Sequence, residues 1–199
     1  EGISMKKVLS ILMIFVLGVG LAACGQNDGN GSSSGKRSSQ GGNVLVAYFS
    51  WSGNTEEMAS YIAEQTGGDL LEIQPENPYP ADYNECGDVA LAERDSNARP
   101  AIANLPDSID EYDTILIGYP IWWHTAPMII GTFLESYDLS NVDIYPFTQS
   151  ASMDTEQFNN SVEFVRDNAG RANVHDGLFA EPSDTETIDG YLSDNGLAD

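Results

Sequence analysis

Basic side chains are scarce in this sequence. It holds 8 lysines and arginines against 31 aspartates and glutamates, which gives a formal net charge of −23 over 199 residues. A body this acidic repels nucleic acid and anionic lipid surfaces, because both carry negative charge. We therefore expect no nucleic-acid partner, and we expect either a basic partner protein or simply a well-solvated acidic surface.

Cysteine and histidine are scarce too, with two of each. Cys24 and Cys86 form no C-x-x-C pair, and His124 and His175 lie far apart in the sequence, so no metal site is predicted. The patterns G-x-x-x-x-G-K-[ST] and G-x-G-x-x-G are missing. A bound nucleoside triphosphate or dinucleotide pyrophosphate is therefore not expected.

The stretch "MKKVLSILMIFVLGVGLAAC", which starts at Met5, has the layout of a secretory signal: two lysines, an apolar run and small residues at the end. Its last residues, "LAAC" followed by glycine, resemble the lipobox of bacterial lipoproteins, which implies cleavage before Cys24 and attachment of a lipid to its thiol. The alternative is an ordinary cleaved signal with an incidental cysteine. We expect a signal peptide over residues 1–23, translation from Met5, and an exported protein anchored by lipid to the outer face of the cell membrane.

Residues 24–43 carry almost no apolar side chains after the cysteine and are rich in glycine and serine, which is typical of a flexible tether. One folded domain is then expected over residues 44–199, long enough to bury a core. Cys86 would be its only thiol, so no internal disulfide is predicted, and we expect this cysteine to be incidental.

Short apolar runs alternate with amphipathic segments along the domain, and near-continuous apolar runs are typical of strands buried on both faces of a parallel sheet. This alternation predicts a doubly wound α/β fold with a five-stranded parallel sheet. The expected strands are 44–49, 69–75, 114–120, 142–148 and 172–179, and the expected helices are 55–67, 127–138, 154–168 and 184–194, with 89–97 as a further candidate.

The stretch "VAYFSWSGNT" runs from the first strand into the first helix. In a doubly wound sheet, this is the turn where a phosphate group meets a helix amino terminus. The side chains of Ser50, Ser52, Asn54 and Thr55 can donate hydrogen bonds, and Gly53 lets the backbone come close. The turn therefore predicts a phosphate monoester bound without cationic side chains. The alternative is an ordinary polar start of a helix.

Together, "YFSWSGNT", "GDLLEIQPENPYP", "GYPIWWH" and "IYPF" resemble the flavodoxin family, and within it the bacterial flavodoxin-like domains that bind FMN. The resemblance is close over residues 44–150 and looser beyond. It implies a three-layer α/β/α fold with FMN as cofactor. By this resemblance, the phosphate is enclosed by Ser50, Trp51, Ser52, Gly53, Asn54 and Thr55, and the flavin ring is lined by Pro120, Ile121, Trp122, Trp123 and His124.

A flavin ring needs a flat apolar wall, which adjacent tryptophans can supply. We expect one of Trp122 and Trp123 to pack in the core and the other to lie near the ring. His124 is a candidate to tune the flavin by charge or hydrogen bonding, the alternative being a surface histidine. Tyr79 and Tyr83 are further aromatic candidates near the site, for which packing at the surface is the simpler interpretation.

A third loop is implied after the fourth strand, where relatives carry a glycine-rich turn. This chain has Thr148, Ser150 and Ser152 there and no glycine. The three hydroxyl groups remain candidates for contact with FMN, but without glycine the backbone cannot approach the flavin edge as closely.

Three functions fit these observations. The first is an FMN-dependent electron carrier with a redox protein as partner, and its acidic surroundings are expected to lower the flavin's reduction potential. The second is an FMN-dependent NAD(P)H or quinone oxidoreductase, although no separate nicotinamide-binding domain is visible. The third is a binding lipoprotein that kept the fold and lost the cofactor. Reduction of bound flavin by NADH or NADPH without a second protein would separate the first from the second.

Overall fold

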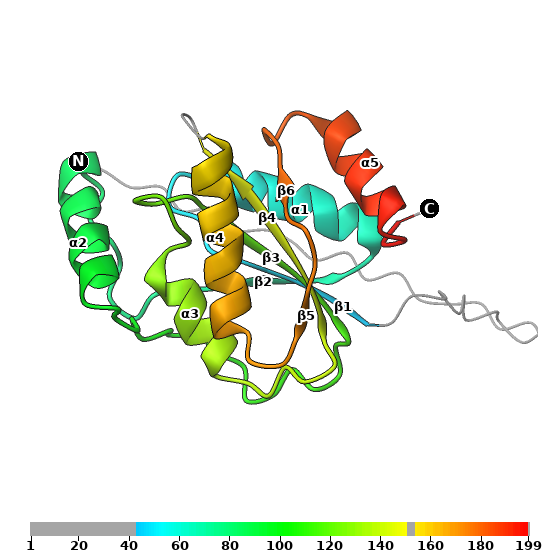
Figure 1. The fold of residues 1–199 in the computed structure, drawn as a ribbon, viewed down its shortest axis with the longest axis horizontal. Helices are drawn as coiled ribbons and strands as arrows, with labels where there is room; N and C mark the ends of the chain where they lie inside the picture. The colour runs from blue at the N-terminus through cyan, green and yellow to red at the C-terminus, as the bar shows by residue number, and fades with distance from the viewer. Residues whose placement is uncertain (1–42, 151–153, 199) are drawn as a thin grey trace, which may run out of the picture. The chain divides into compact units, whose positions relative to one another are not determined.

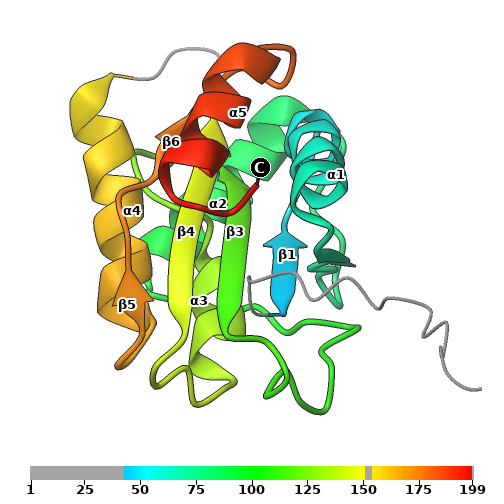
Figure 2. The same ribbon diagram turned by 90° about the vertical axis from the view of Figure 1, so that its right-hand side faces the viewer.

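The computed structural model describes residues 43–150 and 154–198. The strands form one parallel sheet in the order β2-β1-β3-β4-β5, and β6 also pairs with β4 (Figures 1 and 2). This is the predicted doubly wound α/β architecture. The strands are β1 (Val44–Tyr48), β2 (Asp69–Glu72), β3 (Thr114–Pro120), β4 (Asp143–Gln149), β5 (Asn173–Val174) and β6 (Leu178–Phe179).

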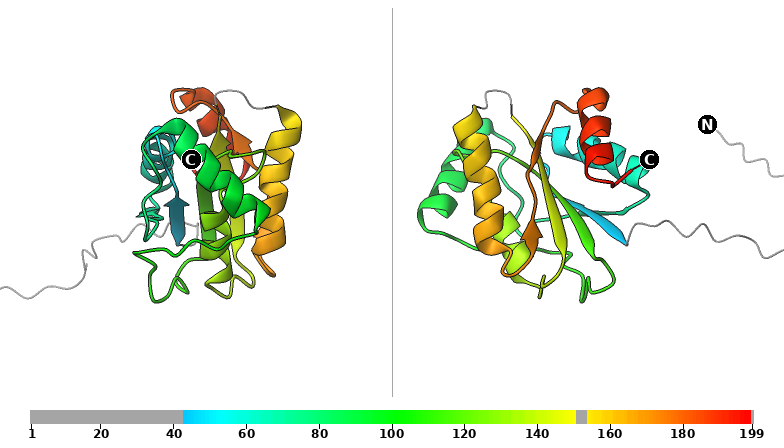
Figure 3. Two further views of the ribbon diagram at one scale, coloured as in Figure 1. Left: turned by 90° about the vertical axis from the view of Figure 1, so that its left-hand side faces the viewer. Right: turned by 45° about the vertical axis from the view of Figure 1, so that its right-hand side comes forward.

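Helices cover both faces of the sheet, so the domain has three layers. The right-hand view of Figure 3 shows α1 and α5 on one side of the sheet and α3 and α4 on the other. α2 lies beside α3. The helices are α1 (Asn54–Thr66), α2 (Tyr83–Asp95), α3 (Met128–Glu135), α4 (Thr155–Asn168) and α5 (Thr185–Asp194).

The core is divided by the sheet into two clusters, because successive residues of a strand point to opposite faces. In β3, Ile115 and Ile117 are buried in the cluster that contains residues of α3 and α4, whereas Leu116 is buried in the cluster of α1 and α5. Gly118 follows on this second face, where a Cβ atom would stand 2.2 Å from the ring of Phe147. Glycine is therefore required there for β4 to lie against β3.

The prediction of one continuous strand over residues 172–179 was wrong. The chain pairs with β4 as two short strands, β5 and β6, which are separated by residues 175–177. Polar contacts hold the interruption: His175 bonds Asp143 at 2.6 Å, and the Tyr191 hydroxyl donates to the backbone oxygen of Asp176 at 2.6 Å. These groups are fixed by side chains distant in sequence, so the apolar pattern of the strand could not reveal the break.

The candidate helix 89–97 corresponds to α2, which begins earlier than predicted, at Tyr83, and ends at Asp95. The Asp82 carboxylate accepts hydrogen bonds from the amides of Asn84 and Glu85, which fixes that start. Within residues 43–150 and 154–198, no helix has the length and apolar character needed to cross a membrane. The predicted signal peptide and lipid-bearing Cys24 lie outside the described residues.

Candidate functional site

A cavity of about 560 Å³ opens at the carboxyl ends of β1, β3 and β4. Four segments supply its walls: the loop after β1, the segment 120–124 after β3, the end of β4 with the first turn of α4, and α2. No lysine or arginine among the described residues lines it. Of the predicted site residues, it is lined by Trp51, Ser52, Asn54, Pro120, Ile121, Trp122, Trp123, His124 and Ser150.

The amino terminus of α1 is open at the loop after β1. Gly53 occupies the N-cap position with φ 93°, a left-handed conformation that favours glycine, and no side chain caps the helix. The first intrahelical bond runs from the Glu57 amide to the Gly53 oxygen at 2.9 Å. The amides of Asn54, Thr55 and Glu56 make no hydrogen bond to any described residue. These three donors, with the positive end of the helix dipole, can bind an anion.

Hydroxyl groups of the same turn add to these donors. The Ser50 oxygen accepts a bond from the Gly53 amide at 3.1 Å, which closes the turn and leaves the hydroxyl hydrogen of Ser50 for another acceptor. Thr55 is only 1% exposed, and its hydroxyl makes no hydrogen bond to a described residue. Ser52 and Asn54 are exposed and line the cavity, whereas Ser50, Gly53 and Thr55 belong to the turn without lining it.

Residues Trp122 to Thr125 form a two-residue hairpin at the rim. The backbone amide of Trp122 donates to Thr125 at 2.9 Å, and the amide of Thr125 donates back at 3.1 Å. The two central residues, Trp123 and His124, have φ 48° and 67°. Hairpins of this length use left-handed residues, but bulky side chains are disfavoured in that conformation, so the turn is strained.

α2 holds this hairpin in place. The indole nitrogen of Trp123 donates to the Gly87 oxygen at 2.8 Å. Arg94 donates to the backbone oxygen of Trp123 at 3.2 Å, and its guanidinium carbon lies 5.7 Å from the centre of the Trp123 ring. These contacts offset the strain and make α2 and the hairpin one wall of the cavity.

The two tryptophans have different surroundings. Trp122 packs edge-on against Phe49 and Tyr79, with ring centres 5.3 and 5.1 Å away, so it is the member of the pair that joins the core. Trp123 is 43% exposed. Both line the cavity, and Trp123 is the outer of the two.

The end of β4 brings only part of the predicted third loop to the cavity. Thr148 is completely buried, and its hydroxyl donates to the Tyr119 oxygen at 2.5 Å, so this group links β3 to β4 and does not line the cavity. Ser150 does line it. Ser152 lies outside the described residues.

Sequence reasoning offered Tyr83 as a candidate near the site, and Tyr83 lines the cavity, but the rest of the α2 wall and two glutamines, Gln149 and Gln157, were missed. The start of α2 was signalled by Asp82 and Glu85, an N-cap residue with an acid three positions later. No pattern showed that Asn84, Cys86, Gly87 and Asp88 would line the cavity with Tyr83. Burial raises the pKa of the Cys86 thiol in this wall, and the negative charge of Glu93 adds to the effect, which keeps the thiol protonated.

A family model described as Flavodoxin matches residues 43–191. The chain belongs to the flavodoxin family. This agrees with the sheet order, the open helix end after β1 and the aromatic hairpin after β3. No curated protein matches this flavodoxin-family sequence.

Solved structures resemble this flavodoxin-family chain over most of its length. A Bacteroides uniformis protein, named a flavoprotein provisionally, is 36% identical with a TM-score of 0.68, over 77% of this chain and 99% of that one. A Bacteroides eggerthii protein with the same provisional name is 34% identical, also with a TM-score of 0.68. The match covers 76% of this chain and 96% of that one. A flavoprotein from Lactobacillus acidophilus, solved in complex with FMN, is 29% identical with a TM-score of 0.60, over 73% and 97%.

Proposed function

We propose that this flavodoxin-family chain binds FMN at the cavity and works as an electron carrier for a partner protein. The observation that supports this most is the amino terminus of α1, where the amides of Asn54, Thr55 and Glu56 have no partner among the described residues. Asn54, the first residue of that helix, lines a cavity with an aromatic wall. The complex of the Lactobacillus acidophilus relative with FMN supports the choice of ligand.

The phosphate end of FMN fits the turn after β1. A dianion needs several donors, and the amides of residues 54–56 together with the hydroxyls of Ser50, Ser52 and Thr55 can supply them. The exposed carboxylates of Glu56 and Glu57 lie in the same helical turn, but as exposed groups they are screened by water and salt. Lysine and arginine are not required, because the helix end supplies the positive potential.

The flavin ring fits the opposite part of the cavity. Trp122 and Trp123 offer apolar flat surface, and the neighbouring backbone of residues 120–124 offers donors and acceptors. When bound, FMN supplies the ability to accept and release electrons. The protein's residues bind it, orient it and set how much of it solvent can reach.

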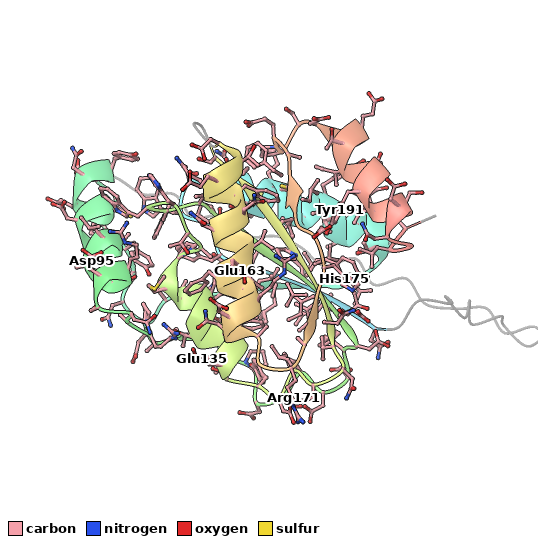
Figure 4. The ribbon with its side chains drawn as sticks, in the orientation of Figure 1. Asp95, Glu135, Glu163, Arg171, His175 and Tyr191 are labelled. Carbon is pink, nitrogen blue, oxygen red and sulfur yellow. The ribbon has the colours of Figure 1, made fainter. Side chains whose placement is uncertain are left out.

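An electron carrier needs an exposed contact surface near its cofactor, and the rim of this cavity offers one. Tyr83 of α2 is 77% exposed and Trp123 of the hairpin is 43% exposed, and both line the cavity. α2 also carries the exposed acidic residues Glu85, Asp88 and Asp95, and Figure 4 labels Asp95 on this helix. A basic partner protein would be attracted to this rim by charge.

We also propose that the protein is exported and carries a lipid on Cys24, a proposal that rests on the sequence of residues 5–24 alone. Secretion in an unfolded form would mean that FMN is captured outside the cytoplasmic membrane. Replacing Cys24 with alanine should release the protein from the membrane fraction. Retention of the C24A variant in that fraction would contradict lipid anchoring.

The ligand proposal is tested by titrating the purified chain into FMN and into riboflavin while measuring flavin fluorescence. FMN should be quenched at one equivalent, and riboflavin, which lacks the phosphate, should bind at least tenfold more weakly, because charged hydrogen bonds are lost. Thr55→Ala should lower FMN affinity and leave riboflavin unchanged, whereas Ser193→Ala on α5, outside the cavity, should change neither. Equal weak binding of both ligands would overturn the proposal.

The carrier and the reductase are separated by adding NADH or NADPH to the chain with bound FMN. An electron carrier should keep its oxidised flavin spectrum until a reductase protein is added. Rapid bleaching by the nicotinamide alone would establish the enzyme instead.

A further inference from the structure

Two of the three tryptophans at the cavity are fixed by hydrogen bonds of their side chains, and the third is not. The indole nitrogen of Trp51 donates to the Pro80 oxygen at 3.0 Å, and that of Trp123 donates to the Gly87 oxygen at 2.8 Å. The indole nitrogen of Trp122 makes no such bond to a described residue. Packing therefore sets the orientation of the Trp122 ring, although this ring lines the cavity as the other two do.

Trp122 packs in a group of three rings that come from three separate segments. Phe49 follows β1, Tyr79 precedes α2, and Trp122 belongs to the hairpin after β3. The ring centre of Tyr79 lies 5.1 Å from that of Trp122 and 5.5 Å from that of Phe49. Phe49 is 2% exposed and its amide donates to the Gly118 oxygen at 2.9 Å, so the sheet holds this ring. Tyr79 contacts Trp122 without lining the cavity.

A carboxylate of α2 holds Tyr79. The Tyr79 hydroxyl donates to Oε2 of Glu93 at 2.7 Å, and Glu93 and Trp122 line the same small hollow of about 10 Å³. Glu93 forms no ion pair with a described residue, and the neighbouring Arg94 pairs with Asp95. Burial raises the pKa of Glu93, and the bond from Tyr79 opposes this effect. The phenol is therefore the group that compensates this partly buried charge.

We propose that Glu93 is a positioning residue of the flavin site, which acts through the Tyr79 hydroxyl to hold the ring of Trp122 in place at the cavity wall. This inference rests on the proposed function. The sheet fixes one ring of the group and Glu93 fixes the second, so the third is held between them. A wall that is ordered before the ligand arrives lowers the free energy lost on binding.

Fluorine NMR of the full chain labelled with 5-fluorotryptophan reports the surroundings of Trp122 directly. The sequence holds 3 tryptophans, so three signals are expected, and Trp122→Phe identifies the relevant one. Tyr79→Phe removes only the hydroxyl, and Glu93→Met removes the acceptor and keeps the length of the side chain. Both should shift the Trp122 signal and leave those of Trp51 and Trp123 in place. Glu93→Gln keeps an oxygen that can accept the bond and should restore the original signal.

Flavin affinity gives the second readout. FMN and riboflavin should both bind about fivefold more weakly to Y79F and to E93M, because the flavin ring is common to the two ligands. The double variant should lose no more than either single variant, since both changes remove the same bond. Glu93→Gln should recover most of the affinity. Glu64→Met, which removes an exposed carboxylate of α1, is the matched control and should change neither the Trp122 signal nor the affinities.

Three results would overturn the inference. The first is a Trp122 signal that does not move in Y79F, and the second is a pair of affinity losses that add in the double variant. The third is a loss in E93Q as large as that in E93M, which would assign the effect to the charge and not to the bond. Thermal unfolding shows whether each variant is folded. Tyr79→Phe keeps the packed ring, so it carries the test should Glu93→Met fail to fold.

The proposed function fails in a different way from this inference. If the unmodified chain bound neither flavin, FMN binding would be wrong, and Glu93 would have no flavin site to position. If FMN bound tightly and Y79F and E93M matched the unmodified chain in the Trp122 signal and in both affinities, only the role of Glu93 would be wrong.

Discussion

The amino terminus of α1 differs from those of the other helices. Asp82, Asp154 and Asp184 cap α2, α4 and α5 with a carboxylate that accepts from the first-turn amides. α3 has no side-chain cap, but the Ile130 amide donates to the Pro127 oxygen at 2.9 Å. Only α1, among the described helices, begins with a glycine and leaves its first three amides without a partner. The capped helix ends are closed within the chain, and under the proposed function the end of α1 is left open for the phosphate of FMN.

The largest effect should come from closing the open end. Ser52→Asp places a carboxylate beside the amides of α1, where it would repel the phosphate and compete for its donors. We expect FMN binding to weaken by about 3 kcal/mol, with riboflavin unaffected. Fluorescence titration measures both. Ser52→Asn, of the same size without the charge, is the control, and an equal loss in the two variants would contradict the electrostatic reason.

Removing one donor should have a smaller effect. Thr55→Ala should cost about 1.5 to 3 kcal/mol of FMN affinity, the range for a hydrogen bond to a charged group. Thr55→Ser restores the hydroxyl and should recover most of this loss. Calorimetric titration gives the two affinities. Full recovery by Thr55→Val, which restores only the volume, would show that packing and not donation is lost.

Opening a closed helix end should affect stability and leave binding unchanged. Asp184→Ala removes the cap of α5, whose carboxylate accepts from the Thr187 amide at 3.2 Å. We expect the free energy of unfolding to fall by about 1 kcal/mol in urea, with FMN affinity unchanged. Asp184→Asn keeps a capping oxygen and should lose less. A loss of FMN affinity in D184A would contradict the prediction that the capped end of α5 affects stability and not binding.

The contacts between α2 and the hairpin should have an effect of similar size on the ligand. Arg94→Met removes the bond to the Trp123 oxygen and the cation above its ring, and we expect FMN and riboflavin affinities to fall together by about 1 kcal/mol. Arg94→Lys keeps the charge and should retain part of the affinity. An unchanged affinity in R94M would mean that the strained hairpin holds its shape without α2.

The smallest effect is expected at β5, where polar groups are paired with each other. Figure 4 places His175 well away from Asp95 on α2. The hydrogen bond from His175 lowers the pKa of Asp143 below its ordinary value of 3.8. A carboxyl whose pKa is lower in the folded protein stabilises the fold above its unfolded pKa and loses that contribution as the pH falls through the folded value.

Urea unfolding between pH 6 and the acid limit of the fold should therefore show this contribution. Below about pH 4, the unmodified chain should lose more free energy of unfolding than Asp143→Asn. The difference between the two losses should be only a few tenths of a kcal/mol, because the side chains of Asp143 and His175 are both partly exposed to water. FMN affinity should be the same in both at neutral pH. Parallel stability curves for the two proteins would contradict the pairing.

The sequence allowed the sheet to be predicted because its apolar runs are local. β1, β3 and β4 appeared at nearly the observed residues, and the turn at Gly53 was visible because hydroxyls and glycine follow β1 directly. The break at residues 175–177 depends on partners in β4 and α5, which no local pattern contains. The strand prediction failed there for that reason.

The part of the site that lies in one continuous loop, the turn after β1, could be predicted from the sequence. The parts that bring together residues distant in sequence could not. The α2 wall is held near the turn after β1 and the hairpin by bonds between residues distant in sequence, among them Trp51 to the Pro80 oxygen at 3.0 Å and Trp123 to the Gly87 oxygen. The left-handed conformation of Trp123 and His124 could not be read from two bulky residues that disfavour it.

A crystal structure of the chain grown with FMN is the most direct test of phosphate binding at the open end of α1. The phosphate oxygens should lie at hydrogen-bond distance, about 2.9 Å, from the backbone nitrogens of Asn54, Thr55 and Glu56, with no lysine or arginine in contact. A phosphate bound elsewhere in the cavity, or a turn whose own side chains occupy those amides in the presence of the nucleotide, would contradict it.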